Sequence, residues 1–403
     1  MQTSQNRIDM GTEREKLWNA EYIKVWLVNF FIFFSFMLVT PLLPLYLSET
    51  FGADKHTIGV VLSGYTLTAL LIRPFSGFIV DSFDRKKVLV CCMLLFFLLF
   101  AGYLLTASLL IFAIVRTLHG TPFGAATVAN STLAIDVLYP SRRSEGIGYY
   151  GLSNNVATAI SPSIALWIYE TTHNYQLIFI LSLLFAGLGL AISASLKTTK
   201  KEPIKDTKKI SLDRFFLLKA WRGAICIMCF AFSYGILSTY IAIYGKERLG
   251  ITSGTGLFFF LCSAGLILSR LIGSRTLRKG MIVQNASFGI VISLIGYLLF
   301  AGVHNNWGYY GAAFIIGLGN GHMFPAFQTM FINLAPNTRR GTANSSLLIS
   351  WDVGIGLGIM IGGVVVEYLG YYSAFWASGI VNAIGVLYFF VAMRQSYNRD
   401  KLR

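Results

Sequence analysis

The chain has 403 residues, of which 55% are hydrophobic and only 13% are charged. An average soluble domain carries about 25% charged residues, so this composition excludes a soluble globular protein and indicates a membrane protein. The net charge of +15 would suit a nucleic-acid-binding protein, but the basic residues lie in short connections between apolar runs, which excludes that class.

Apolar runs of about 20 residues, the length that crosses a bilayer as a helix, recur along the chain. The first run follows a charged tail without a small-residue cleavage site, so it should remain as a span rather than act as a signal peptide. The five cysteines lie in or beside apolar runs and lack a second ligand pair, so we expect no metal site. We predict twelve spanning helices at residues 25–47, 58–80, 88–107, 109–135, 147–169, 175–196, 223–244, 254–274, 281–301, 307–332, 343–366 and 371–393.

The basic residues fall in alternate connections between these helices. Of the 33 Lys and Arg residues, 27 lie in tails and loops on one side, whereas only Lys55, Lys246 and Arg248 lie on the other. Positively charged loops stay in the cytoplasm, so this bias predicts that both termini are cytoplasmic. The net charge is therefore a signal of membrane topology.

The two halves of the sequence resemble each other. At an offset of 197 residues, Arg73 corresponds to Arg270, and the pair Arg142–Arg143 corresponds to Arg339–Arg340. Such duplication is typical of transporters whose site lies between two repeats. We predict cytoplasmic tails at 1–24 and 394–403, six-helix halves at 25–196 and 223–393, and a basic cytoplasmic linker at 197–222.

The stretch LIRPFSGFIVDSFDRKK, residues 71–87, places an arginine and a proline in an apolar run and ends in charges. Gly77 allows a neighbouring helix to come close. Asp81 stands where the bilayer meets water and can pair with a base or a helix N-terminus, while Arg85 and Lys86 reach the interface. We expect Arg73, like Arg270, to lie at a helix contact rather than to bind substrate.

This stretch resembles the G-x-L-x-D-R-x-G-R-R/K motif of the major facilitator superfamily, with Ser82 and Asp84 in place of the usual Arg and Gly. The resemblance implies an all-α membrane protein with twelve transmembrane helices in two six-helix repeats. It also implies a cytoplasmic gate. Asp136 lies beside the loop that carries two arginines, and we assign the gate to Gly77, Asp81, Arg85, Lys86, Asp136, Arg142 and Arg143.

Three residues are candidates for proton coupling. Arg116 and His119 in the fourth span resemble the family's R-x-x-x-G motif, which is often linked to that role. Asp352 is the only acidic residue that we place inside a span of the second half, and its repeat counterpart is Asn155. A carboxylate there carries either the driving proton or a salt bridge across the interface, with Arg116 or Arg270 as partner.

The fifth span, with NNVATAISPSIAL, resembles a weakened form of the G-x-x-x-G-P-x-x-G-G motif of proton-coupled exporters; Pro162 matches, and small residues replace the glycines. Glycines at four-residue spacing in the eleventh span predict a close helix contact. Polar and aromatic residues are expected to line a central cavity: Asn29, Thr40, Tyr46, Asn154, Asn155, Tyr234, Tyr240, Asn320, His322, Gln328 and Trp351.

The sequence therefore predicts a secondary transporter of the bacterial inner membrane that exports small organic compounds in exchange for protons by alternating access. One alternative is an uptake permease that cotransports protons with a sugar or organic anion, and another is a membrane receptor or scaffold that transports nothing. No phosphate-binding loop or hydrolase motif is present, so we expect no enzymatic activity and no cofactor. The expected partners are a small-molecule substrate, protons and the lipid bilayer, without nucleic acid, and the expected state is a monomer.

Overall fold

A computed structural model describes residues 16–53, 55–197, 215–251 and 256–402. Most of the predicted linker and of the N-terminal tail lies outside the described residues. Within those ranges the regular structure is helical. The helices of the first half are α1 (Ala20–Val39), α2 (Leu43–Phe51), α3 (Lys55–Ser82), α4 (Arg85–Leu104), α5 (Leu109–Asp136), α6 (Arg143–Thr172) and α7 (Tyr175–Ala194).

The second half has the same kind of helices. They are α8 (Trp221–Leu249), α9 (Gly256–Arg278), α10 (Ile282–Gly302), α11 (Asn306–Leu334), α12 (Arg340–Tyr388) and α13 (Arg394–Asp400). Short 3-10 turns at Pro140–Arg142, Leu218–Ala220 and Asn337–Arg339 precede α6, α8 and α12, and a π-helical turn at Phe389–Met393 joins α12 to α13.

Two helix boundaries differ from the predicted spans. We predicted one helix over 25–47, but the chain breaks between α1 and α2 because Pro41 has no N–H to donate and its ring blocks the preceding turn. Conversely, α12 contains the predicted span 343–366 and most of the predicted span 371–393, which continues through the π-helical turn, and the chain turns between them at Gly370. The φ of Gly370 is 82°, a backbone conformation that favours glycine.

Eight helical segments in the described ranges are long and apolar enough to cross a membrane, and one of them, Asn337–Asp400, includes both spans of α12. The helices α3, α6 and α11 are long enough, with 28, 30 and 29 residues, but are not among the eight. Each of the three contacts the other half of the chain, α3 against α12 and α6 against α9 and α11. With these three helices added and α12 counted as two spans, the helix pattern is consistent with twelve membrane-spanning helices.

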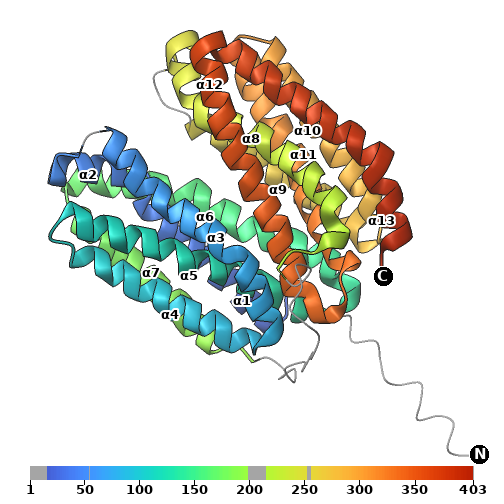
Figure 1. Cartoon of the computed structure of the whole chain (residues 1–403), viewed down its shortest axis with the longest axis horizontal. Helices are drawn as coiled ribbons and strands as arrows, with labels where there is room; N and C mark the ends of the chain where they lie inside the picture. Colours follow the sequence, from blue (N-terminus) through green and yellow to red (C-terminus); the bar gives the residue numbers. More distant parts are fainter. Residues whose placement is uncertain (1–15, 54, 198–214, 252–255, 403) are drawn as a thin grey trace, which may run out of the picture.

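The helices form two bundles, α1–α7 and α8–α13 (Figure 1). One buried apolar core lies in the first bundle and two lie mainly in the second, and one of these two also includes Ile135 and Ile147 of the first bundle. Close packing inside a bundle depends on glycine: a Cβ at Gly358 of α12 would overlap the carbonyl of Phe232 in α8. Large apolar side chains such as Leu184, Trp167 and Val391 remain exposed on the outside of the bundles, where a bilayer covers them.

The ribbons of the two bundles approach each other where α12 begins and lean apart toward α2 (Figure 1). We call the first region the contact end. There, the ends of α3, α5 and α11 meet the starts of α6 and α12, so the charged loops predicted from the sequence gather in one place.

Candidate functional site

The α3–α12 contact joins the two halves at the contact end. Asp81 accepts hydrogen bonds from the backbone N–H of Gly341 at 2.8 Å, the backbone N–H of Thr342 at 2.8 Å and the Thr342 hydroxyl at 2.9 Å. These donors belong to the first turn of α12, which receives no side-chain cap from its own N-cap residue, Arg339. A carboxylate of the first half therefore caps a helix of the second half and lies at the positive end of its dipole.

Gly77 allows the two helices to approach this closely. A Cβ at Gly77 would lie 2.6 Å from the Ser345 hydroxyl oxygen and 3.0 Å from the Thr342 Cα. The Thr342 Cα cannot move without shifting α12, so any side chain at position 77 would separate α3 from α12.

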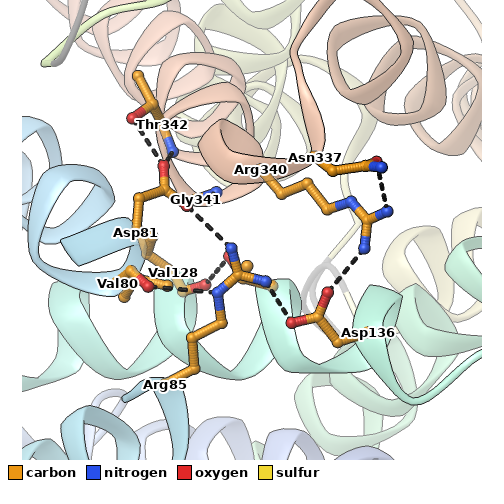
Figure 2. Close-up of polar contacts among 10 residues, drawn as sticks. Val80, Asp81, Arg85, Val128, Asp136, Asn337, Arg340, Gly341 and Thr342 are labelled. Atoms are coloured by element: carbon orange, nitrogen blue, oxygen red, sulfur yellow. Dashed lines mark hydrogen bonds and ion pairs between the residues drawn. The ribbon is translucent and has the colours of Figure 1, made fainter. Parts of the chain in front are cut away.

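A chain of alternating charges continues from this cap (Figure 2). The Arg85 guanidinium lies 3.0 Å from the Asp81 carboxylate and also bonds to Asp136. Asp136 in turn accepts a hydrogen bond of 2.7 Å from Arg340 of the second half, which also donates to Asn337 at 2.7 Å. The Arg340 side chain is only 4% exposed, so separating the halves would leave a buried charge without its partner.

A second contact, between α6 and α9, also joins the halves. Glu145 accepts a hydrogen bond of 2.7 Å from Arg142 of its own half and forms an ion pair of 3.5 Å with Arg278 of the other. At the offset of 197 residues, Glu145 corresponds to Thr342 and Arg278 corresponds to Asp81. In the α3–α12 contact the acidic residue belongs to α3, whereas in the α6–α9 contact it belongs to α6, the counterpart of α12. Glu145 was not among our predicted site residues.

The other predicted gate residues lie nearby. Arg143 donates to the carbonyl of Ile135 at 3.1 Å and so connects the start of α6 to the end of α5. Lys86 is half-buried at the start of α4 and forms no ion pair within the described ranges. Arg340 and Thr342 were also missed as site residues, although the repeat relation between Arg143 and Arg340 could have identified Arg340.

Asp352 forms an ion pair across the halves. Its carboxylate in α12 lies 2.9 Å from the Arg73 Nε of α3, and the two side chains are 22% and 8% exposed. We expected Arg116 or Arg270 as the partner of any such salt bridge, and this expectation was wrong. Arg270 instead donates to the carbonyl of Gly321 within its own half.

The other two coupling candidates lie inside the first half. The Tyr103 hydroxyl joins them, at 3.2 Å from the Arg116 Nη1 and 2.9 Å from the His119 Nδ1. The Arg116 guanidinium also stacks 4.1 Å from the centre of the Tyr65 ring. In the described part of the chain neither residue bonds to Asp352, so the three candidates do not form one cluster.

Most of the predicted cavity residues bond to neighbouring helices or to their own backbone. Asn29 donates to Ser153, Thr40 to the carbonyl of Phe36, and Tyr240 to the carbonyl of Ile359. Asn320 accepts from Ser293, and the His322 ring bonds to Asn285. Tyr46 packs among the rings of Phe51, Phe112, Tyr175 and Phe179.

Among the remaining cavity candidates, one is linked to the other half through a hydrogen-bonded neighbour. Gln328 donates to Asn344 at 2.8 Å, and Asn344 bonds to Ser131 of the first half. The Trp351 ring lies 5.8 Å from that of Tyr234 and 5.3 Å from that of Phe324, directly before Asp352 in the chain. Asn154 and Asn155 are half-buried on α6. An ion pair and an aromatic cluster are therefore adjacent on α12.

Residues 25–285 and 283–402 match the family model of the Major Facilitator Superfamily. A staphylopine export protein of Staphylococcus aureus is 22% identical over 372 residues, which cover 87% of this chain and 90% of that protein. The multi-drug resistance efflux pump PmrA of Streptococcus pneumoniae is 23% identical over 398 residues, covering 94% and 97%. The crystal structure of the human organic anion transporter MFSD10 (TETRAN) has a TM-score of 0.78 at 15% identity, covers 92% of this chain and 99% of its own, and shows similarity of fold.

Proposed function

The chain belongs to the major facilitator superfamily and is a multi-pass membrane transporter, and we propose that it exports small organic compounds in exchange for protons. The names of both bacterial relatives describe export or efflux, which supports this direction. Transport by alternating access involves no covalent step, so we propose no enzymatic activity and a single chain as the working unit.

We place the transporter in the bacterial plasma membrane with the contact end on the cytoplasmic side. In this proposal the halves 25–196 and 223–393 move against each other, the basic linker 197–222 joins them in the cytoplasm, and both tails are cytoplasmic. A reporter fused after Arg403 tests the orientation, and periplasmic activity of that reporter would contradict it.

The ion pair between Arg73 and Asp352 carries the proposal of proton coupling. It links a helix of each half and retains 22% exposure at the carboxylate, so a proton can reach it. Protonation of Asp352 removes the attraction to Arg73 and weakens the link between α3 and α12. A charge held in a spanning helix costs about 2.5–3.5 kcal/mol on insertion scales, so its retention supports a functional role.

These events give a cycle of exchange. With the contact end closed, substrate leaves to the outside and a proton binds Asp352, which loosens the α3–α12 contact. The contact end then opens to the cytoplasm, where the proton leaves to a medium of higher pH and substrate binds. The ion pair forms again, the contact end closes, and substrate has moved outward while one proton has moved inward.

Transport in proteoliposomes tests this function. Compounds that dissipate an imposed pH gradient only when the protein is present identify the substrates. We expect Asp352→Asn to abolish uphill transport while downhill exchange of substrate continues. Glu367→Gln, which neutralises an exposed acid on the same helix, should behave as wild type.

Other outcomes favour the alternatives. Substrate that moves in the same direction as protons would indicate an uptake permease, and a protein for which no compound dissipates the gradient would indicate a receptor or scaffold. Uphill transport by Asp352→Asn with unchanged pH dependence would remove Asp352 as the coupling acid.

A further inference from the structure

A cavity of about 380 Å³ lies at the contact end of the second half. Three elements form its walls: the start of α10, the end of α11 and the C-terminal helix α13. It shares no residue with the α3–α12 contact, the α6–α9 contact or the ion pair of Asp352. The proposed transport cycle does not use it.

Two hydrogen bonds hold α13 and the residues that follow it against the end of α11. The Asn333 side chain donates to the Tyr397 hydroxyl at 2.9 Å, and the Leu402 N–H donates to the Asn333 carbonyl at 2.9 Å. Tyr397 is only 2% exposed. The wall formed by α13 is therefore built into the fold.

The charges of α13 and of Lys401, the residue that follows this helix, are divided between two faces. Arg394 and Lys401, seven residues apart, both line the cavity, and no acidic residue does. The acid of this helix, Asp400, points elsewhere and bonds to Ser396 and Arg399. Arg394 and Lys401 form no ion pair within the described ranges, so the cavity has a surplus of positive charge.

The start of α10 adds further donors. Its N-cap residue, Met281, provides no side-chain cap and also lines the cavity. The positive end of the α10 dipole therefore faces the same space, together with the amides of Gln284 and Asn398. Such a set of groups suits a ligand with several negatively charged oxygens.

The position of the cavity indicates where this ligand comes from. Because α10 is a 21-residue spanning helix that starts here, the cavity lies at the depth of lipid headgroups. Its volume also exceeds what a single inorganic phosphate fills. We propose that this cavity binds the phosphodiester headgroup of an anionic phospholipid, with Arg394 and Lys401 as the principal contacts.

The test measures thermal unfolding of the purified full-length protein in detergent with added phosphatidylglycerol, phosphatidylcholine, glycerol 3-phosphate or inorganic phosphate. We expect phosphatidylglycerol alone to raise the unfolding midpoint of the wild type. Arg394→Gln combined with Lys401→Gln should lose this shift. Arg399→Gln removes one basic residue from the other face of the same helix and should keep it.

Native mass spectrometry of the same proteins counts the phosphatidylglycerol molecules that each protein retains. If the double variant is unstable, the single variant Arg394→Gln replaces it, and it should retain less phosphatidylglycerol than the wild type. An equal shift and equal retention in wild type and double variant would overturn the proposal. A shift of the same size with inorganic phosphate would also overturn it and assign the cavity to a soluble phosphate compound.

Discussion

Asp81→Asn should open the contact end of the transporter. The two Thr342 donors bond to one carboxylate oxygen of Asp81, and the Gly341 N–H and Arg85 bond to the other. Asparagine keeps one oxygen and places an NH₂ group against the remaining donors. If the NH₂ group faces Thr342, both bonds from that residue of the second half are lost; in the other orientation the Gly341 bond and the Arg85 bond within the first half are lost.

The size of the effect follows from those contacts. Hydrogen bonds to a charged group contribute about 1.5–3 kcal/mol each, and water replaces part of this in the open state. We expect the closed state to lose about 3 kcal/mol relative to the open state. That loss shifts the ratio of open to closed molecules on the order of 100-fold.

Double electron–electron resonance measures the distance between two spin labels, one on each half, and the populations in the distance distribution give that ratio. Exposed positions at the contact end, Ala194 of α7 and Gln395 of α13, can carry the labels after the native cysteines are replaced. Asp84→Asn is the matched control, because Asp84 caps α4 of its own half through the Lys87 N–H and, among the described residues, forms no hydrogen bond or ion pair with the second half. Equal distance distributions for Asp81→Asn and Asp84→Asn would refute the reasoning.

Two further variants test the two contacts between the halves. Gly77→Ala should destabilise the closed state by about 1–3 kcal/mol and reduce transport, because its methyl group meets the Thr342 Cα. Gly356→Ala is the control and should have neither effect, because a Cβ at Gly356 meets nothing within 4 Å. Transport rates in proteoliposomes and the spin-label distances check both. Arg278→Gln should change the open-to-closed ratio by less than about fivefold, since Arg278 is half exposed and such ion pairs contribute at most about 1 kcal/mol; a 100-fold change would contradict this.

The sequence predicted the helices well because the bilayer fixes their length and apolar character. It missed the break after Val39, where two prolines lie within an apolar run that hydropathy alone joins into one span. The division into halves 25–196 and 223–393 rests on the internal repeat, because repeats preserve spacing, and it stays a prediction. The apolar spans and the basic loops can be predicted because they depend only on which residue types follow one another along the chain.

The partners of individual residues were harder to predict. Asp81 binds backbone donors, which every helix start offers, so no residue type identifies Thr342 as its partner. Polar residues such as Asn29 and His322 bond to neighbouring helices here, although the sequence would also allow them to face a cavity. The orientation of each helix about its own axis decides between the two, and the hydrophobic periodicity of the sequence does not determine that orientation. The choice of Arg73 over Arg270 as partner of Asp352 depends on which helices meet between the halves.

The position of that ion pair indicates how a proton would control the contact end in the proposed cycle. Arg73 lies eight residues before Asp81 on α3, about 12 Å along the helix, and Asp352 lies on α12, whose first turn Asp81 caps. Protonation site and cap therefore act on the same two helices. The α6–α9 contact has no equivalent acid, because Asn155 occupies the position that corresponds to Asp352.

This arrangement predicts a pH dependence of the closed state. The ion pair exists only when Asp352 is ionised, so lowering the pH from about 8 to about 5.5 should raise the open population of the wild type. Asp352→Asn lacks the pair at every pH and should be more open than the wild type at about pH 8, with little further change on acidification. Arg73→Gln, which removes the other partner, should shift the population in the same direction. A wild-type distance distribution that stays constant over this range would show that protonation of Asp352 does not open the contact end, and the coupling group would then have to be sought elsewhere.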